Sequence, residues 1–371
     1  MIILLLLTAC PPGGGSDPTP TPTTAPTPTT APTTTPTPSS YQVLEVTEDI
    51  DTFTTWTTGN LYLIRAWDFY VNNTLVIEPG VIVKFHPNDG PYLTLGGTGT
   101  IVANGTIEQP IIFTSYKDDD HGGDTNGDGA ATSPARRDWG YINTNGLNSS
   151  SFTYCHFYYG GDSTYTATLA LDYSANTTVS NCVFAYNDGS ESNGWYGALD
   201  ASSALTGTVI TGNTFFDNIR PLSIGTAFDL DNSNSFSSPQ DDNVTNVFNY
   251  IYVYDNDIKN NLVWQETEVA FVIDDNDLWI NDTLTLGDNV VIKFYPDSFF
   301  VLNQGVSSLV NYNGSGVYFT SFKDDTLKGD SNGDGAATSP GNGDWGGIFD
   351  NSLSIPDPYY FQWANILYDS Y

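Results

Sequence analysis

Residues Phe152–Gly161 read FTYCHFYYGG, and three later stretches of the chain repeat this pattern. The repeats are VSNCVFAYND from Val179, ITGNTFFDN from Ile210 and YDNDIKNN from Tyr254. Their alignment gives two columns two residues apart, which are Cys155, Cys182, Asn213 and Asn256, and then Phe157, Phe184, Phe215 and Ile258. Repeats spaced 27, 31 and 43 residues apart are typical of a solenoid, in which each turn buries its face against its neighbours.

The local pattern of these repeats predicts strands. Apolar and polar residues alternate over short runs, aromatic and β-branched residues are abundant, and Asn, Gly and Asp separate the runs. No segment shows a sustained helical period. One strand per coil with asparagine in a column predicts an all-β chain folded as a parallel β-helix. Stacked Asn side chains would bond to one another, and aromatic rings would stack beside them.

A coarser repeat spans about half of the chain. VIVKFHP at Val81–Pro87 returns as VVIKFYP at Val290–Pro296, and DWGYI from Asp138 returns as DWGGI from Asp344, 206 residues later. We therefore predict two copies of one unit, residues 41–255 and 256–371. The second copy stops in FQWANILYDSY, which aligns with the stretch from Phe152. We expect a truncated chain there, with a native end covered by a partner as the alternative.

The opening coils carry a family resemblance. Residues Asn72–Ser115, which include NNTLVIEPGVIVKF and end in FTS, resemble the first coils of right-handed parallel β-helices. Such coils occur in bacterial surface proteins and in pectate-lyase-like enzymes. The resemblance implies a right-handed solenoid. It says little about activity, because this architecture hosts lyases, hydrolases, adhesins and purely structural proteins.

One loop is repeated almost unchanged, as GDTNGDGAATSP at Gly123–Pro134 and GDSNGDGAATSP at Gly329–Pro340. Its Asp-x-Asn-x-Asp-Gly pattern places oxygen side chains at alternate positions before a sharp turn, as in the first half of an EF-hand calcium loop. The Glu expected at the twelfth position is replaced by Ala135 and Gly341. The loop therefore resembles the shorter calcium loops of dockerin-like and surface β proteins. A glycine-rich turn without an ion is the alternative.

We predict two structural Ca²⁺ sites, in loops 117–138 and 323–344. Mg²⁺ is less suitable, because it tolerates irregular coordination poorly. The candidate ligands of the first loop are Asp124, Asn126, Asp128, Ala130 (carbonyl), Thr132 and Asp138, with one of the aspartates 118–120 as a further ligand. Those of the second loop are Asp330, Asn332, Asp334, Ala336 (carbonyl), Thr338 and Asp344, with Asp324 and Asp325 nearby. Each ion would pin a long insertion that has no core of its own.

Charge restricts the partners. The chain has 43 Asp and Glu against 10 Lys and Arg, a formal charge of −33. This excludes nucleic acid and anionic lipid, because both require clustered Lys and Arg. Apart from Cys10, only Cys155 and Cys182 are present. They are too few for a disulfide scaffold, and the sequence leaves open whether they pair.

The N-terminal residues predict an anchor and a spacer. MIILLLLTAC, residues 1–10, resembles the signal peptide and lipobox of bacterial lipoproteins, which implies a lipid on Cys10. It lacks the basic residues of a secretory signal, so an upstream start is expected. It is also shorter than the about 20 apolar residues of a membrane span. Residues 11–40, dense in Pro and Thr, predict a disordered polyproline-type stalk. We therefore expect a lipid-anchored protein of the bacterial outer envelope.

The sequence offers few candidates for a catalytic site. Lyases on this fold resemble one another in using an Arg or Lys base with calcium. Arg136 and Arg137 are specific to the first copy and are the candidates for such a base, although two surface Arg beside six acids more often balance charge. Glycosidases need two carboxylates flanking a cleft, and the sequence cannot select that pair among 43 acids. No Gly-x-Ser-x-Gly nucleophile motif is present.

We therefore expect a non-enzymatic, calcium-stabilised surface lipoprotein. It would bind a polysaccharide or another cell surface, or serve as an adhesin-like structural module. The 23 Tyr and 8 Trp supply rings that stack on sugars wherever they are exposed. The alternative is a secreted polysaccharide lyase or glycoside hydrolase of the pectate-lyase-like type.

Overall fold

The structure is a computed structural model that describes residues 41–86, 92–146, 148–161, 167–188, 196–254, 257–274, 277–353 and 359–371. These residues belong to one compact unit, Pro38–Tyr371. The predicted signal peptide with Cys10 and the predicted stalk lie outside the described residues. Within the described chain, no helix has the length and apolar character to cross a membrane.

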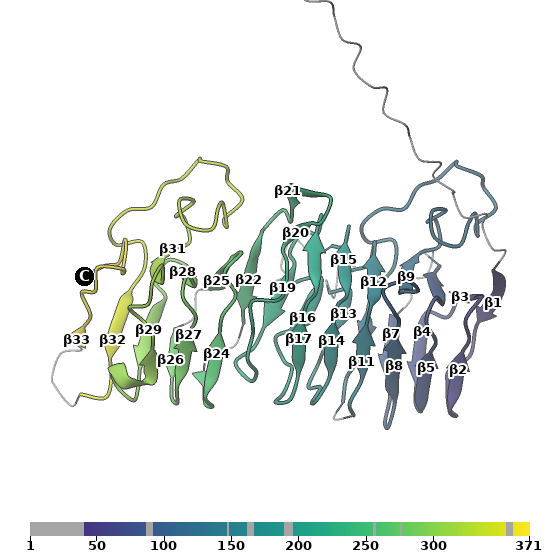
Figure 1. Ribbon diagram of the computed structural model, residues 1–371, viewed down its shortest axis with the longest axis horizontal. Coiled ribbons are helices and arrows are strands. Elements are labelled where there is room, and N and C mark those ends of the chain that lie inside the picture. The colour runs from purple at the N-terminus through teal and green to yellow at the C-terminus, as the bar shows by residue number, and fades with distance from the viewer. Residues whose placement is uncertain are drawn as a thin grey trace, which may run out of the picture. The chain divides into compact units, whose positions relative to one another are not determined.

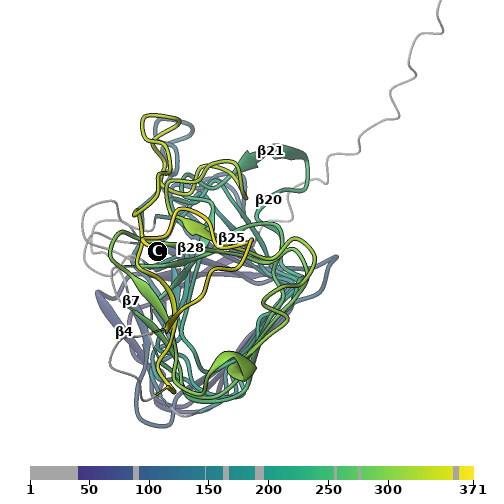
Figure 2. The same cartoon turned by 90° about the vertical axis from the view of Figure 1, so that its left-hand side faces the viewer.

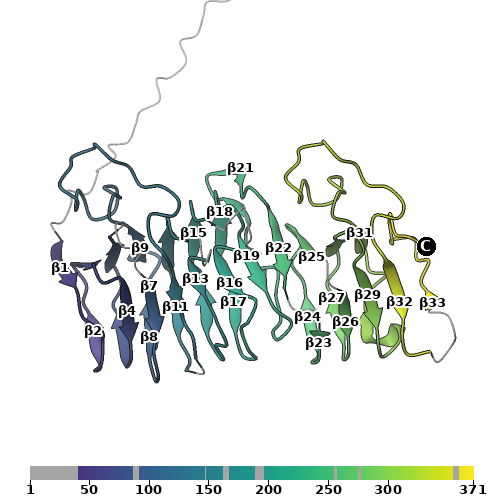
Figure 3. The same ribbon diagram turned by 180° about the vertical axis from the view of Figure 1, so that it is seen from behind.

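Short strands stack into three long sheets, two in the first part of the chain and one that runs along most of its length (Figure 1, and from behind Figure 3). The seven-stranded sheet contains β1 (Gln42–Val46), β3 (Asn60–Ile64), β6 (Ile82–Phe85), β9 (Ile111–Ser115), β12 (Cys155–Tyr158), β15 (Val183–Ala185) and β18 (Thr214–Phe216). The ten-stranded sheet contains β4 (Asp68–Val71), β7 (Tyr92–Leu95), β10 (Ile142–Asn143), β13 (Leu169–Ala170), β16 (Leu199–Ala201), β19 (Leu222–Ile224), β22 (Tyr250–Val253), β25 (Ala270–Ile273), β28 (Val291–Phe294) and β31 (Tyr318–Ser321). The six-stranded sheet contains β2 (Thr54–Trp56), β5 (Thr74–Ile77), β8 (Thr100–Asn104), β11 (Ser151–Thr153), β14 (Thr178–Ser180) and β17 (Val209–Thr211).

Two further sheets flank the end of the ten-stranded sheet. The five-stranded sheet contains β23 (Asp257–Ile258), β26 (Leu278–Ile280), β29 (Phe299–Leu302), β32 (Gly347–Asp350) and β33 (Tyr359–Tyr360). The three-stranded sheet contains β24 (Leu262–Trp264), β27 (Leu284–Leu286) and β30 (Leu309–Val310). A hairpin of β20 (Ser237–Ser238) and β21 (Asp241–Thr245) interrupts the coils. Among the described residues, the 3-10 turn η2 (Val306–Ser308) is the one helical element.

The strand order confirms the predicted parallel β-helix. The chain visits three sheets in turn, so each regular coil contributes one strand to each sheet. Every described strand pair is parallel except β20–β21 and β32–β33. Figure 2 looks along the stacked coils. Crossover connections between parallel strands of one sheet are right-handed in about 98% of cases, in keeping with a right-handed solenoid.

A ladder of phenylalanine rings fills the interior. The register pairs Phe157 with Phe184 and Phe184 with Phe215, as the sequence alignment predicted. Phe113 precedes them and Phe236 follows, and successive ring centroids lie 4.7 to 5.4 Å apart. Adjacent strands lie about 4.7–4.9 Å apart, so one inward-facing ring per coil stacks directly on the next.

The alignment of the fourth repeat, from Tyr254, was wrong. The structure places Phe236 rather than Ile258 beside Phe215, with ring centroids 5.4 Å apart. Ile258 belongs to β23 in another sheet, and Asn256 lies outside the described residues. In the neighbouring column Asn234 follows Asn213, whose Nδ2 donates to Asn234 Oδ1 over 3.0 Å. The stretch that continues the pattern is therefore SNSF, residues 233–236.

A second asparagine ladder, which the sequence alignment missed, runs parallel to the first. Asn187 Nδ2 donates to Asn218 Oδ1 over 3.0 Å, and Asn218 Nδ2 donates to Asn246 Oδ1 over 2.9 Å. Asn218 Nδ2 also donates to the carbonyl of Phe184 over 2.8 Å. Because these side chains are buried, each bond satisfies a group whose desolvation would otherwise be unfavourable.

The two sequence copies occupy different sheets. β6 and β9 lie in the seven-stranded sheet, whereas their counterparts β28 and β31 lie in the ten-stranded sheet. An irregular stretch between β19 and β22 carries the β20–β21 hairpin and shifts the second copy by one sheet. The local packing is nevertheless reproduced. Phe85 stacks on Trp139 at 4.1 Å, and Phe294 stacks on Trp345 at 4.2 Å.

The two described cysteines are buried free thiols. Cys155 and Cys182 follow one another in the register of β12 and β15. Cys155 Sγ lies 3.2 Å from the carbonyl of Ala103, and Cys182 Sγ lies 3.4 Å from that of Phe152. Burial raises the pKa of Cys155 well above its usual value, so its thiol stays protonated near neutral pH.

A buried carboxyl on β16 gives a pH-dependent prediction. Burial raises the pKa of Asp200 to about 6, although Ser202 and Ser223 donate hydrogen bonds to it. The folded state therefore binds this proton more tightly than the unfolded state, and stability falls as pH rises through about 4 to 6. We expect the free energy of unfolding of Asp200→Asn, relative to that of the unmodified chain, to rise by up to about 3 kcal/mol between pH 4 and pH 8. Urea unfolding of both proteins in saturating calcium measures this. An equal difference at both pH values would contradict it.

Candidate metal site

Two long loops leave the solenoid at equivalent places in the two copies. The first follows β9 and ends near Asp138, and the second follows β31 and ends near Asp344. Both project from the same side of the solenoid (Figures 1 and 2). The predicted ligands other than Asp138 and Asp344 lie within these projecting segments.

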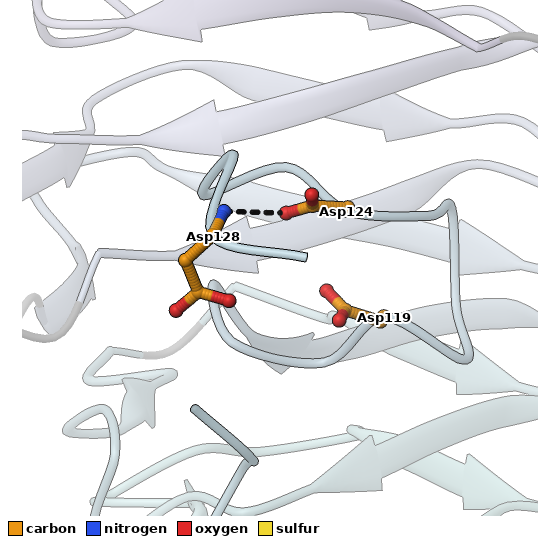
Figure 4. A group of neighbouring side chains, drawn as sticks. All are labelled: Asp119, Asp124 and Asp128. Carbon is orange, nitrogen blue, oxygen red and sulfur yellow. Dashed lines mark hydrogen bonds between the residues drawn. The ribbon is translucent and has the colours of Figure 1, made fainter. Parts of the chain in front are cut away.

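Each loop gathers three carboxylates. Oxygen atoms of Asp119, Asp124 and Asp128 lie within 4.8 Å of one another, and their side chains converge on one region (Figure 4). Residues Asp325, Asp330 and Asp334 form the same arrangement in the second loop. Calcium takes six to eight oxygen ligands at 2.3–2.6 Å, so such a set suits a hard divalent cation.

The turn chemistry explains how the first carboxylate is held. Asp124 Oδ1 accepts hydrogen bonds from the backbone amides of Gly127 (2.7 Å) and Asp128 (3.2 Å, dashed in Figure 4). Its Oδ2 accepts one from the Gly129 amide over 2.9 Å. Gly127 and Gly129 both have positive φ, 74° and 73°, which glycine adopts without steric penalty. The second loop repeats the bonds to Asp330, from Gly333 and Gly335 at 2.7 Å each.

Asn126 and Thr132, both predicted ligands, lie beside Asp128. Asn126 Nδ2 donates to Asp128 Oδ2 over 3.1 Å, and Thr132 Oγ1 donates to the same oxygen over 2.6 Å. In the second loop, Asn332 Nδ2 lies 3.0 Å from Asp334 Oδ2, which also accepts from the Thr338 hydroxyl. The structure therefore brings four of the predicted side chains together in each loop, Asp124, Asn126, Asp128 and Thr132 in the first and Asp330, Asn332, Asp334 and Thr338 in the second. The carbonyl oxygens of Ala130 and Ala336 stay predicted ligands.

Asp119 and Asp325 complete the clusters. In each of them, Oδ1 is buried and has no hydrogen-bond partner. Burial raises the pKa of Asp119, and the nearby Asp124 raises it further. The pKa of Asp325 is raised in the same way, by burial and then by Asp330. A buried, unpartnered carboxylate oxygen is unfavourable, and a cation among the three carboxylates would satisfy it.

The other two predicted ligands, Asp138 and Asp344, have a different role. Asp138 accepts from Ser115 Oγ (2.7 Å), Lys117 Nζ (2.7 Å) and the Ala135 amide (3.0 Å). Asp344 makes the equivalent contacts, including one with Lys323 Nζ over 2.8 Å. These carboxylates close the base of each loop and are not part of the three-carboxylate clusters. We therefore leave them out of the proposed ligand sets.

A buried lysine holds each loop against the solenoid. Lys84 Nζ donates to the carbonyls of Asp118 (2.6 Å) and Gly123 (2.8 Å) and to Thr125 Oγ1 (2.7 Å). Lys293 Nζ makes the matching bonds to the second loop, at the Gly329 carbonyl and Ser331 Oγ, 2.8 Å each. Burial lowers the pKa of each lysine to about 8. These ammonium groups donate to carbonyl and hydroxyl oxygens. Their charge also acts on the nearby carboxylates, because it opposes the rise that burial causes in the pKa of Asp119 and Asp325.

Each loop packs against apolar side chains on the outside of the solenoid. Leu61, Leu63 and Ile82 form an outer cluster, and a Cβ on Gly122 of the first loop would lie 2.6 Å from Leu61 Cδ1. The second outer cluster contains Tyr250, Tyr252 and Val272, with Phe248 at its edge. A Cβ on Gly333 would lie 2.5 Å from Phe248 Cε1. Pinning the loops therefore also keeps apolar surface covered.

In comparisons with family models, curated proteins and solved structures, nothing matches this chain. The interpretation of the loops therefore depends on their geometry and on its duplication within the chain.

The predicted catalytic candidates lie at the end of the first loop. Arg136 donates through Nε and Nη2 to the carbonyl of Asp217, the Nε contact being 3.2 Å. Arg137 pairs with Asp188, which is 3% exposed. Both guanidinium groups therefore tie the loop to coils that lie farther along the solenoid.

Proposed function

We propose that the chain is a calcium-stabilised β-helix that acts as a carbohydrate-binding or surface-binding module, or as an adhesin-like structural module. The observation that carries the calcium part is the pair of three-carboxylate clusters, each with a buried and unpartnered oxygen on Asp119 or Asp325. Both loops cover outer apolar clusters, and side-chain and backbone hydrogen bonds hold each loop at its base. An ion in each would fix them in place.

Exposed aromatic rings support the binding part of the proposal. Trp67 is 57% exposed, and Tyr70 on the neighbouring β4 is 40% exposed. Trp56 and Trp264 belong to the core and can contact no ligand, while Trp195 lies outside the described residues. The large negative charge disfavours anionic ligands and leaves neutral or cationic ligands, or anionic surfaces bridged by cations, as partners.

A lyase or hydrolase is the alternative, and no described contact favours it. A catalytic base must reach the proton it abstracts. The guanidinium groups of Arg136 and Arg137 are instead engaged with Asp217 and Asp188.

The proposal is tested with the full chain in calcium buffer, run through native gels that contain β-glucan, xylan, galactomannan, chitosan or polygalacturonate. Retardation in at least one gel is the expected result. The same polysaccharides are incubated with the protein and assayed for reducing and unsaturated sugars. Free migration in all gels would contradict a carbohydrate-binding function. Sugar release that Arg136→Ala or Arg137→Ala abolishes would establish the enzymatic alternative.

We also propose display at the outer envelope by a lipid on Cys10, a proposal that rests on the N-terminal sequence. Cells expressing the chain are labelled with a tagged fatty acid. The label should appear on the protein and vanish in Cys10→Ala. A labelled Cys10→Ala variant would overturn the proposal.

A further inference from the structure

The solenoid wall has a break where the two sequence copies meet. β17 is the last strand of the six-stranded sheet, and β24 is the first strand of the three-stranded sheet. Between them the wall is completed only by residues 227–231. This segment pairs with β24 through the single bridge Leu230–Trp264, with the Leu230 amide 3.0 Å from the Val263 carbonyl.

On its other side, this segment contacts β17 only loosely. Within the segment, Thr211 Oγ1 donates to Asp231 Oδ2 over 3.1 Å. Just beyond it, Asn234 Nδ2 donates to the Ile210 carbonyl over 3.3 Å, and Ser233 Oγ bonds Thr211 Oγ1 and the Gly212 amide at 2.8 Å each. Between residues 227–231 and β17, both fully described, no backbone hydrogen bond forms. The result is a cleft of about 470 Å³ between β17, the segment and the start of β24. Ligand sites commonly have volumes of about 300–1,000 Å³.

We propose that this junction cleft is the ligand site of the chain and that its ligand is a neutral polysaccharide. The inference rests on the proposed carbohydrate-binding function and specifies its site and ligand class. The apolar part of the lining is Val209, Ile210, Ala227, Phe228 and Leu262. Val209 is 44% exposed, whereas Phe228 and Leu262 are largely buried. Thr206, Thr211, Asn260 and Asn261 add hydroxyl and amide groups along the rim.

The charge of the lining selects the ligand class. Asp229 and Asp231 border the cleft, and none of its described lining residues is Lys, Arg or His. An anionic sugar would therefore meet two carboxylates without a compensating cation. A purely apolar ligand would bury the side-chain amides of Asn260 and Asn261 without hydrogen bonds, which is unfavourable. A neutral sugar chain has C–H faces for the apolar side and hydroxyl groups for the polar rim.

The two carboxylates of the lining already accept hydrogen bonds from within the protein. Both oxygens of Asp231 already accept hydrogen bonds, from Thr211 and from Ser233. One oxygen of Asp229 accepts from the Val263 amide over 2.8 Å. The amides of Asn260 and Asn261, by contrast, are exposed and point to hydrogen bonding with sugar hydroxyls.

The test compares two cleft variants with a matched control in the same polysaccharide gels. Val209→Trp fills the cleft, and Asn260→Ala with Asn261→Ala removes the rim amides. Val310→Trp, at a 42% exposed valine of β30, adds the same ring outside the cleft. We expect the dissociation constant for the retaining neutral polysaccharide to rise at least tenfold in both cleft variants and to stay within twofold in the control.

Every other outcome contradicts a stated part of the proposal. Retardation of the unmodified chain that both cleft variants keep would overturn the junction cleft and leave the proposed function standing. Retardation only by polygalacturonate or only by chitosan would overturn the neutral ligand class. No retardation of the unmodified chain in any gel would overturn the carbohydrate-binding function and this inference with it. Circular dichroism of each variant verifies that the fold is retained.

Discussion

Removing calcium with EDTA will lower the melting temperature of the chain on the order of 10 °C. A ligand present at 100 times its dissociation constant adds about 2.7 kcal/mol per site to the free energy of unfolding. Two loops that each bind calcium at this saturation would contribute roughly 5 kcal/mol. The shift should be accompanied by exposure of the outer clusters around Leu61 and Tyr250, which a dye that binds apolar surface detects.

Variants assign this shift to the loops. Asp124→Ala should remove about half of the difference between calcium and EDTA, and adding Asp330→Ala should remove the rest. Asp242→Ala, at an exposed acid of the β21 hairpin, is the control and should leave the difference unchanged. Equal melting temperatures of the unmodified chain in calcium and in EDTA would contradict the stabilising role.

Truncating the phenylalanine ladder will have an effect of similar size. Phe184 is fully buried and stacks between Phe157 at 4.7 Å and Phe215 at 5.1 Å. Phe184→Ala therefore leaves a cavity that the neighbouring rings cannot fill, and we expect a loss of about 3–5 kcal/mol. Tyr186→Ala, two residues later and 38% exposed, should change stability by less than about 1 kcal/mol. Urea unfolding followed by tyrosine and tryptophan fluorescence measures both. Equal losses would show that the ladder is not the core.

The regular part of the fold could be predicted because its signal is local and repeated. The Phe157, Phe184 and Phe215 column follows from alternation within each strand and from the spacing of the coils. Phe236 escaped the alignment because its coil contains only isolated bridges and a hairpin. Such a coil lacks the regular alternation that marks a strand.

Tertiary contacts decide which acids join the three-carboxylate cluster. Three adjacent aspartates, residues 118–120, were equivalent in sequence. The fold distinguishes them, because Asp118 accepts hydrogen bonds from Thr114 and His121 while Asp119 keeps an unpartnered oxygen. Asp138 looked suitable because it is acidic and lies close to the loop. Its partner Lys117 is 21 residues away, a contact that exists only once the loop has closed.

The junction cleft has no counterpart in the repeats. It lies between β17 and β24, which belong to different sheets and to different copies. Its shape follows from the shift of the second copy by one sheet. The periodicity of the sequence does not predict that shift, because the repeats look alike in both copies.

Calorimetric titration of the EDTA-treated, desalted chain with Ca²⁺ tests the central claim most directly. We predict two ions bound per chain, one in Asp124→Ala and none when Asp330→Ala is added, with Mg²⁺ binding more weakly. Absence of calcium binding to the unmodified chain, or two ions still bound by the double variant, would contradict calcium binding by the duplicated carboxylate clusters.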